Sequence, residues 1–276
     1  MVSFKNQCIA LRAHGFSLNQ IVQKTKRSKT SVYFHIKKFP LSENRKQEIR
    51  LARIKRFNDY SLSIKRKSRL DRHPVIFTGW NQNTVLLISH MIFDGTINKN
   101  GCVYTNRNTV LHSQVMLGMK ELYPFSPKKY ESVPGVFKTA YHNVELGAYL
   151  KLKAEELIEN ITQMKKELRR VFLRSFFDDE GSVYFIGKRR AVRGYQHNIK
   201  ILNLIKKLLT GFNINSRVGE KFNEVTITRF ENIDRFAREV NFTEGVMING
   251  NRSNSVWKKS LEKRLILKKA LASYQA

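Results

Sequence analysis

Two groups of carboxylates stand in this chain at places where a purely structural helix would not use them. Residues 84–97 (TVLLISHMIFDGTI) form an apolar helical run that ends at Asp94, directly before a glycine. Residues 171–185 (VFLRSFFDDEGSVYF) end in three acids, the last of which is Glu180, again before a glycine. The C-terminal end of a helix carries partial negative charge, so each acid there costs roughly 0.3–1 kcal/mol. Because the same cost occurs twice, it indicates that these acids have a function.

The chemistry that suits such acids is metal binding. A divalent cation offsets clustered negative charge, and Mg²⁺ prefers carboxylate oxygens. Two acids with one or more Mg²⁺ ions, next to a basic surface, suit hydrolysis of a phosphodiester. The alternative is that the acids only start β-turns, since Asp-Gly is a common turn pair. Two occurrences at matching positions favour the functional interpretation.

The matching positions indicate an internal duplication. When the glycines are aligned, residues 87–95 lie over residues 173–181, and each copy has a small serine (Ser89, Ser175) at its third place. Small side chains would let the two helices approach closely and bring their C-terminal acids together. Further similarities are YTNRN before one predicted helix against YQHN before another, and residues 136–143 against residues 225–232.

The predicted fold is α+β, with two pseudo-symmetric α-β-β-α-β-β-α halves over residues 79–165 and 166–260. The third strand of the first half has no clear signal. In the second half we expect strand 182–186, a basic turn over 187–194, helix 198–209, strands 215–218 and 224–229, and helix 232–240. Residues 261–276 are predicted to form a basic C-terminal helix or tail.

The charge of the chain indicates a polyanionic partner. Its 276 residues include 51 Lys and Arg against 22 Asp and Glu, which gives a net charge of +29. Nucleic acid is the first candidate, because Lys and Arg gain affinity by releasing phosphate counterions. A basic protein without that role, such as a ribosomal one, is the alternative.

Residues 1–40 are predicted to form a small all-α domain of three short helices, the last ended by Pro40. The string GFSLNQIVQKTKRSKTSVYFHIKKF resembles a helix-turn-helix of the resolvase or sigma-factor kind, whose second paired helix lies in the major groove. Residues 41–78 are predicted to be a basic, partly helical linker able to follow a phosphate backbone, although a solvated charged surface is an alternative. The resemblance of residues 15–39 to a helix-turn-helix implies that the following residues contact DNA: Ser28, Lys29, Thr30, Ser31, Tyr33, Lys37 and Lys38.

Residues 81–260 as a whole resemble the LAGLIDADG homing endonucleases in their single-chain, two-repeat form. The resemblance implies two saddle-shaped antiparallel sheets on double-stranded DNA, with the two motif helices packed between them. It also implies a monomer, often intron-encoded, that makes a staggered double-strand break with Mg²⁺. The sequence departs from the family pattern at His90 and Arg174, where small or apolar residues are usual, and at Glu180, where Asp is commoner.

The resemblance also implies roles for individual residues. Asp94 and Glu180, the last acid of each motif, would bind the metal. Asn106 and Gln196 fall at the strand-end position that supports the water network beside the metals, and Lys153 is the candidate basic residue near the first acid. The expected DNA contacts on the sheets and their turns are Lys99, Arg107, Lys138, Lys188, Arg189, Arg190, Arg193, Arg217, Lys221 and Arg229.

Two other functions stay open at this point. Proteins that fuse this fold to a helix-turn-helix also serve as transcription regulators that do not cleave DNA, and an RNA maturase that assists intron splicing would need an equally basic surface. The two cysteines, Cys8 and Cys102, fit neither a disulfide framework nor a zinc spacing. With no secretory h-region and no apolar run of about 20 residues, we expect a reducing intracellular compartment (cytoplasm, nucleoid or organelle matrix) and no membrane partner.

Overall fold

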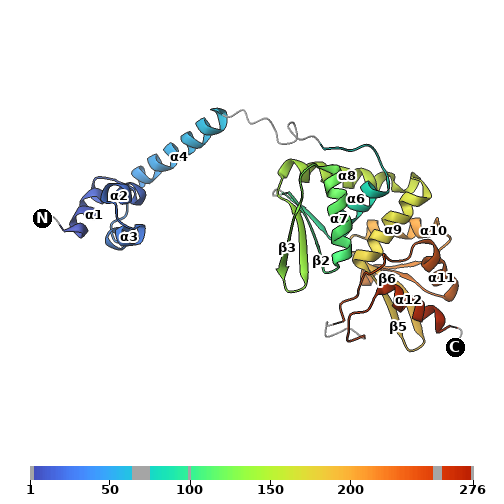
Figure 1. Cartoon of the computed structure of the whole chain (residues 1–276). Helices are drawn as coiled ribbons and strands as arrows, with labels where there is room; N and C mark the ends of the chain where they lie inside the picture. The colour runs from blue at the N-terminus through green and yellow to red at the C-terminus, as the bar shows by residue number, and fades with distance from the viewer. Residues whose placement is uncertain (1–2, 64–74, 99–100, 251–256, 275–276) are drawn as a thin grey trace. The chain divides into compact units, whose positions relative to one another are not determined.

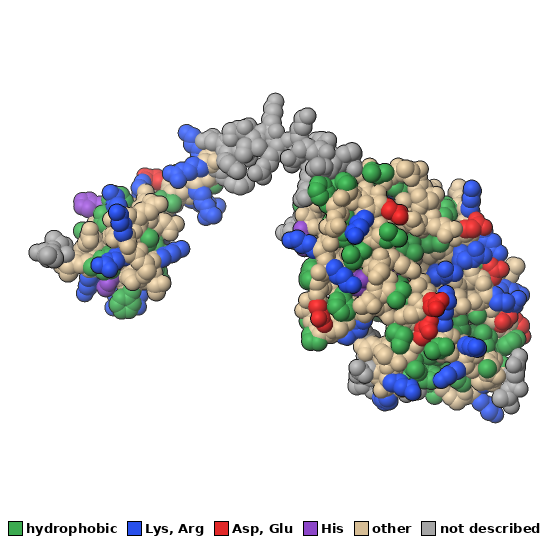
Figure 2. All heavy atoms as spheres, viewed as in Figure 1, with side chains coloured by type: hydrophobic (Ala, Val, Ile, Leu, Met, Phe, Trp, Pro, Cys, Tyr) green, Lys and Arg blue, Asp and Glu red, His purple; other side chains and the backbone are tan. Residues whose placement is uncertain are grey.

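The computed structural model describes residues 3–63, 75–98, 101–250 and 257–274 (Figure 1). The chain divides into two compact units, Met1–Lys67 and Ser68–Ala276, and each is described by itself. No helix within the described ranges is long and apolar enough to cross a membrane. Figure 2 shows Lys and Arg side chains on the visible face of both units, with few acids among them.

Within its described residues, 3–63, the first unit contains only helices, as predicted for residues 1–40, and it also includes a helix of the segment that was predicted to be a partly helical linker. Each of its first three helices begins after a serine whose hydroxyl accepts a hydrogen bond from the backbone N–H three residues further on, which satisfies one free donor of the helix end. Four buried side chains, Cys8, Ile21, Val32 and Ile36, form its small core. The helices are α1 (Phe4–Ala13), α2 (Leu18–Thr25), α3 (Lys29–Ile36) and α4 (Glu43–Ser63).

The second unit contains the two predicted halves, each with the element order α-β-β-α-β-β-α. The first half consists of α6 (Gln82–Phe93), β1 (Gly95–Asn98), β2 (Gly101–Asn106), α7 (Thr109–Leu122), β3 (Lys128–Val133), β4 (Val136–Tyr141) and α8 (Val144–Asn160). The second half consists of α9 (Lys166–Glu180), β5 (Gly181–Ile186), β6 (Arg189–Tyr195), α10 (Ile199–Thr210), β7 (Arg217–Gly219), β8 (Glu224–Ile227) and α11 (Phe230–Glu239). A 3-10 turn (Ile161–Gln163) joins the halves, another (Glu220–Phe222) joins β7 to β8, and α12 (Lys263–Ala272) follows.

Each half builds one antiparallel four-stranded sheet. The strand orders, β1-β2-β4-β3 and β5-β6-β8-β7, correspond position by position. The first strand of each sheet begins at the glycine that follows the acid, since Gly95 pairs with Tyr104 and Gly181 pairs with Gly194. The two sheets are therefore related copies, and the acids occupy the same place in each.

Helices α6 and α9 pack directly against each other, and in Figure 1 they lie side by side between the strands of the two halves. Ser89 and Ser175 are both buried in these helices, and each hydroxyl donates to the backbone carbonyl four residues earlier. Their hydroxyls are therefore satisfied within their own helix, and the small side chains permit the close approach that the sequence predicted. The surrounding aromatic rings, among them Phe93 against Phe172 and Phe176, meet edge to face.

Three details of the prediction need correction. The third strand of the first half, β3, lies where the sequence indicated only a loop. The predicted basic turn over 187–194 is wrong beyond its first two residues, because residues from Arg189 onward form β6. The similarity of residues 136–143 to 225–232 is out of register by three: Thr139 pairs with Tyr104 in the first sheet, and the matching partner of Gly194 in the second is Val225.

Candidate active site

The acids predicted from the sequence lie where the two central helices end. Asp94 follows the last residue of α6, and its backbone N–H donates to the carbonyl of His90 at 3.1 Å. Glu180 is the last residue of α9. In each half the strand begins at the residue after the acid. A Cβ added at Gly95 would lie 2.3 Å from the carbonyl oxygen of Met91. The glycine therefore allows the strand to start immediately after the acid, and Gly181 does the same beside Phe177.

The carboxylates of the two halves are close enough to repel one another. Burial, followed by the charge of Asp179, raises the pKa of Asp94 to about 7. Burial, followed by the charges of Asp94 and Asp179, raises the pKa of Glu180 to about 8. Both effects indicate a half-buried pocket of negative charge that lacks a sufficient counter-ion.

A third acid, Asp179, is the centre of a buried network that the sequence analysis missed. Its Oδ2 accepts from His90 Nδ1 at 2.7 Å, and its Oδ1 accepts from Tyr104 Oη at 2.7 Å. Burial disfavours the charged imidazole, but Asp179 outweighs this and raises the pKa of His90. The signal in the sequence was the departure at His90, a polar residue within an otherwise apolar helix.

Asn106 connects this network to the first predicted ligand. Its Nδ2 donates to Asp94 Oδ2 at 2.6 Å and to Asp179 Oδ1 at 3.3 Å, while its Oδ1 accepts from the backbone N–H of Asn108 at 2.8 Å. Gln196 has the same backbone role in the second half, since its Oε1 accepts from the N–H of Asn198 at 3.3 Å. Within the described ranges, however, no hydrogen bond joins Gln196 to an acid, so the two halves support their acids differently.

A buried lysine, Lys263, interacts electrostatically with the acids, and the sequence analysis also missed it. This side chain of α12 is 5% exposed and donates to the carbonyl oxygens of Phe177 and Asp178 at 3.0 and 2.7 Å. Burial lowers the pKa of Lys263, and the surrounding carboxylates partly oppose this effect. Lys153, the predicted basic residue, lies elsewhere: its Nζ contacts Glu156 at 2.7 Å and sits over the ring of Phe77.

The residues present fit a divalent cation bound with few protein ligands. Among the residues that the structure describes, no group of three or more His, Cys, Asp and Glu side chains is arranged to hold a metal. Asp94 and Glu180 nevertheless supply two carboxylates of the type that Mg²⁺ prefers, and Mg²⁺ usually keeps several of its waters. Burial and the neighbouring carboxylates raise the pKa of both acids, which is the electrostatic environment that a bound cation would offset.

Most of the predicted nucleic-acid contacts lie on the surface. Lys138, on β4, is half-buried. Lys99 lies outside the described residues, so the structure does not bear on it. The exposed members of the set are Ser28, Lys29, Thr30, Ser31, Tyr33, Lys37, Lys38, Arg107, Lys188, Arg189, Arg217, Lys221 and Arg229.

Two predicted contacts are instead engaged within the protein. Arg190 donates from Nε and Nη2 to the hydroxyl and carbonyl oxygens of Ser273, each at 2.6 Å, and its guanidinium lies over the ring of Tyr274. Arg193 Nε donates to Glu224 Oε2 at 2.8 Å on the neighbouring strand. These contacts tie Arg190 to the end of α12 and Arg193 to β8.

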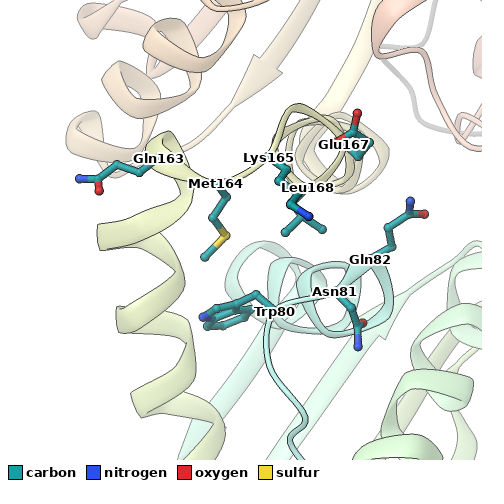
Figure 3. A pocket seen from close by; sticks show the side chains of 8 residues that line it. All are labelled: Trp80, Asn81, Gln82, Gln163, Met164, Lys165, Glu167 and Leu168. Carbon is teal, nitrogen blue, oxygen red and sulfur yellow. The ribbon is translucent and has the colours of Figure 1, made fainter.

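Two hollows lie away from the acids. The first, drawn in Figure 3, is at the N-terminal starts of α6 and α9, where Trp80, Met164 and Leu168 face one another. This is the opposite end of the two helices from Asp94 and Glu180, so the hollow is not part of the acid site. The second lies along β7 and β8, and its rim includes Arg217, Lys221 and Arg229. Glu220 and Glu224 also line this hollow, so it carries charges of both signs.

One family model matches part of the chain. Residues 167–241 match the model described as the LAGLIDADG-like domain. The matched range extends from α9 through α11 and includes Glu180. No curated protein matches the chain.

The solved structures that match this chain have low sequence identity to it. The structure of I-DmoI in complex with DNA and Mn is 14% identical, with a TM-score of 0.45 over 58% of this chain and 96% of that one. The N-terminal LAGLIDADG domain of DUF199/WhiA is 17% identical, with a TM-score of 0.43 over 61% and 88%. Full-length DUF199/WhiA from Thermatoga maritima is 16% identical, with a TM-score of 0.42 over 63% and 60%.

Proposed function

We propose that this protein, whose residues 167–241 form a LAGLIDADG-like domain, is a site-specific DNA endonuclease of the homing type that depends on a divalent metal. The observation that carries the proposal is the meeting of two carboxylates at the ends of two packed helices, one from each half. Asp94 and Glu180 are the acids concerned, and each has a raised pKa caused by burial and by neighbouring acids.

The substrate follows from charge and shape. The chain carries a net charge of +29, and the exposed cations of the sheets include Arg107, Arg217, Lys221 and Arg229. A two-stranded or larger β surface with basic side chains fits the major groove of double-stranded DNA. The first unit would extend the recognised site, because α3 begins at exposed residues of the predicted helix-turn-helix.

The acids act on the phosphodiester through a bound cation. Mg²⁺ or a similar ion held by Asp94 and Glu180 would stabilise the attacking and leaving oxygens of an in-line displacement. The chain's own contribution is to hold these carboxylates at the junction of the two sheets, with Asn106 fixing the carboxylate of Asp94. Since each half supplies one acid, one chain suffices to cut both strands and leave staggered ends.

A cleavage selection tests this function. The purified protein is incubated with Mg²⁺ and a randomised or genomic DNA library, and the new ends are sequenced. Asp94→Asn and Glu180→Gln are run in parallel, and Glu155→Gln, which changes an exposed acid of the same unit, is the matched control. We expect discrete staggered ends from the wild type and the control, and none from the two site variants.

The outcomes distinguish the functions left open by the sequence. Selective DNA binding by all four proteins without any cleavage would replace the proposal with a transcription regulator. Preference for RNA over DNA would replace it with a maturase. A site variant that still cuts both strands at the wild-type rate would remove the assigned acid from the mechanism.

A further inference from the structure

A segment that follows α11 in the chain contacts the end of α9 and the residue that precedes α7. We call residues 242–250 and 257–263 the C-terminal strap. It pairs with itself, because Ile248 N–H donates to the carbonyl of Leu261 at 2.8 Å and Lys263 N–H donates to the carbonyl of Val246 at 2.9 Å. Phe242 and Val246 are fully buried, which anchors the strap in the main core.

One end of the strap holds the end of α9. The backbone N–H of Thr243 donates to Asp178 Oδ1 at 2.8 Å. Lys263 Nζ donates to the carbonyl oxygens of Phe177 and Asp178, which are carbonyls of the last turn of α9. A helix leaves its last four carbonyls without intrahelical partners, and a cation there also interacts favourably with the partial negative charge of the helix end.

Met247 of the strap, which is bridged to Glu262, contacts the first half. Asn108 does not cap α7 with its side chain. Its Oδ1 accepts from the N–H of Met247 at 2.7 Å, and its Nδ2 donates to the carbonyl of Met247 at 3.3 Å. Asn106 donates a hydrogen bond to Asp94 and accepts one from the N–H of Asn108, so Asn108 links the strap to Asp94. One segment therefore fastens the supports of both acids.

The charge of Lys263 belongs to this arrangement. A buried ammonium group is unfavourable unless it is hydrogen-bonded and compensated. Lys263 obtains its hydrogen bonds from two helix-end carbonyls, and the carboxylates of Asp178, Asp179, Asp94 and Glu180 all act on it electrostatically. A side chain without a donor at this position would remove the Lys263 hydrogen bonds to the carbonyl oxygens of Phe177 and Asp178 and a positive charge that interacts with four acids, and Phe177 would keep only the N–H of Gly181.

We propose that Lys263 is a positioning residue of the acid site: its ammonium group fixes the last turn of α9, and so holds the carboxylate of Glu180 where it meets Asp94. The proposal rests on the proposed function only for the identity of the bound cation. It makes Lys263 act through the backbone of α9, without contact to substrate.

The test uses the full chain with Lys263→Met, which keeps the length of the side chain and removes its charge. Lys263→Gln is the second variant in case the methionine protein does not fold, and Lys263→Arg is the conservative rescue. Lys268→Met removes an exposed cation of the same helix, α12, and is the matched control. Hydrogen exchange reports the last turn of α9, and Mn²⁺ alone, titrated against the protein and followed by EPR of the free ion, reports the acid site.

We expect Lys263→Met to increase exchange about tenfold at the amides of the last turn of α9 and to leave exchange in α7 unchanged. Mn²⁺ affinity should fall about 10-fold or more, the usual effect of losing a group that orients metal ligands. Lys263→Arg should recover most of the protection from exchange and most of the Mn²⁺ affinity. Lys268→Met should match the wild type in both measurements. Unchanged exchange in both neutral variants would overturn the proposal, and so would altered exchange with unchanged Mn²⁺ affinity.

Failure of the function gives a different pattern. If the wild type binds no Mn²⁺, or if Asp94→Asn does not weaken its binding, the metal-dependent function fails. The exchange measurement then still decides whether Lys263 fixes the end of α9.

Discussion

His90 and Asp179 form a buried ion pair between the two halves of the second unit. His90 Nδ1 donates to Asp179 Oδ2 at 2.7 Å, and the two side chains are 1% and 0% exposed. The pair joins α6 to α9, so it lies directly between the helices that carry Asp94 and Glu180. Tyr104 completes it by donating to the other oxygen of Asp179.

Removing one partner of this pair should destabilise the protein strongly. His90→Ala leaves the carboxylate of Asp179 buried without its cation, which typically costs about 3–5 kcal/mol. Urea unfolding of the second unit measures the loss. The exposed pair between Arg238 and Asp234 is the control, since Arg238→Ala should cost less than about 1 kcal/mol. A double variant, His90→Leu with Asp179→Leu, should recover part of the loss, and a purely additive double variant would argue against a coupled pair.

The two halves should respond differently to loss of their strand-end amides. Asn106→Ala removes the donor to Asp94 and to Asp179, so cleavage of one strand should slow by about 10- to 100-fold while the other is less affected. Nicked DNA should then accumulate. Among the described residues Gln196 makes no hydrogen bond to an acid, so Gln196→Ala should slow cleavage much less. Strand-resolved cleavage of a labelled duplex measures both, and equal effects of the two variants would contradict the asymmetry.

The stability of the metal-free protein should fall as pH rises from about 4 to about 8. The pKa of Asp94 rises from 3.8 to about 7 on folding, and that of Glu180 rises from 4.5 to about 8. Within this window the folded protein holds protons that the unfolded chain has lost, so raising the pH favours unfolding. The raised pKa of His90 acts in the same direction.

Urea midpoints at pH 5, 6, 7 and 8 check this dependence. The double variant Asp94→Asn, Glu180→Gln should show a flatter profile because it lacks both carboxylates. Added Mg²⁺ should restore stability at pH 8 in the wild type only, since the metal binds the ionised carboxylates. A wild-type midpoint that rises between pH 5 and pH 8 would contradict the raised pKa values.

Two arginines of the second sheet should have separable roles. Arg190→Ala removes the contacts to Ser273 and Tyr274 and should lower the midpoint of thermal unfolding, with little change in the salt dependence of DNA binding. Arg217→Ala removes an exposed cation and should weaken DNA binding while reducing the slope of log K against log salt by about 1. Fluorescence anisotropy at several salt concentrations measures the slope, and an unchanged slope in Arg217→Ala would exclude it from the interface.

The sequence predicted the elements that have strong local signals. The acid-glycine pairs Asp94-Gly95 and Glu180-Gly181 indicated the internal duplication. The two apolar helices that end at these acids predicted the pair of central helices. The strand β3 was missed because all of its residues are exposed, so it has no alternation of buried and exposed side chains. The strand β6 was interpreted as a turn because three arginines occur along it, among them Arg190 and Arg193.

The network around the acids could not be predicted because its members are distant in sequence. His90 and Asp179 are 89 residues apart, and Lys263 lies 85 residues after the carbonyl of Asp178 that it contacts. No local period or spacing connects such residues. The pairs arise only when α6 packs on α9 and when the strap returns to both halves.

The position of the strap in the sequence also determines when the acid site is completed during synthesis. A ribosome adds on the order of 5–20 residues per second, so the 85 residues between Asp178 and Lys263 take roughly 4–17 s to synthesise. During that interval the growing chain has both acid-bearing helices but neither the ammonium group beneath them nor the partner of Asn108. The acid site is therefore completed late in synthesis, after the strands of both sheets.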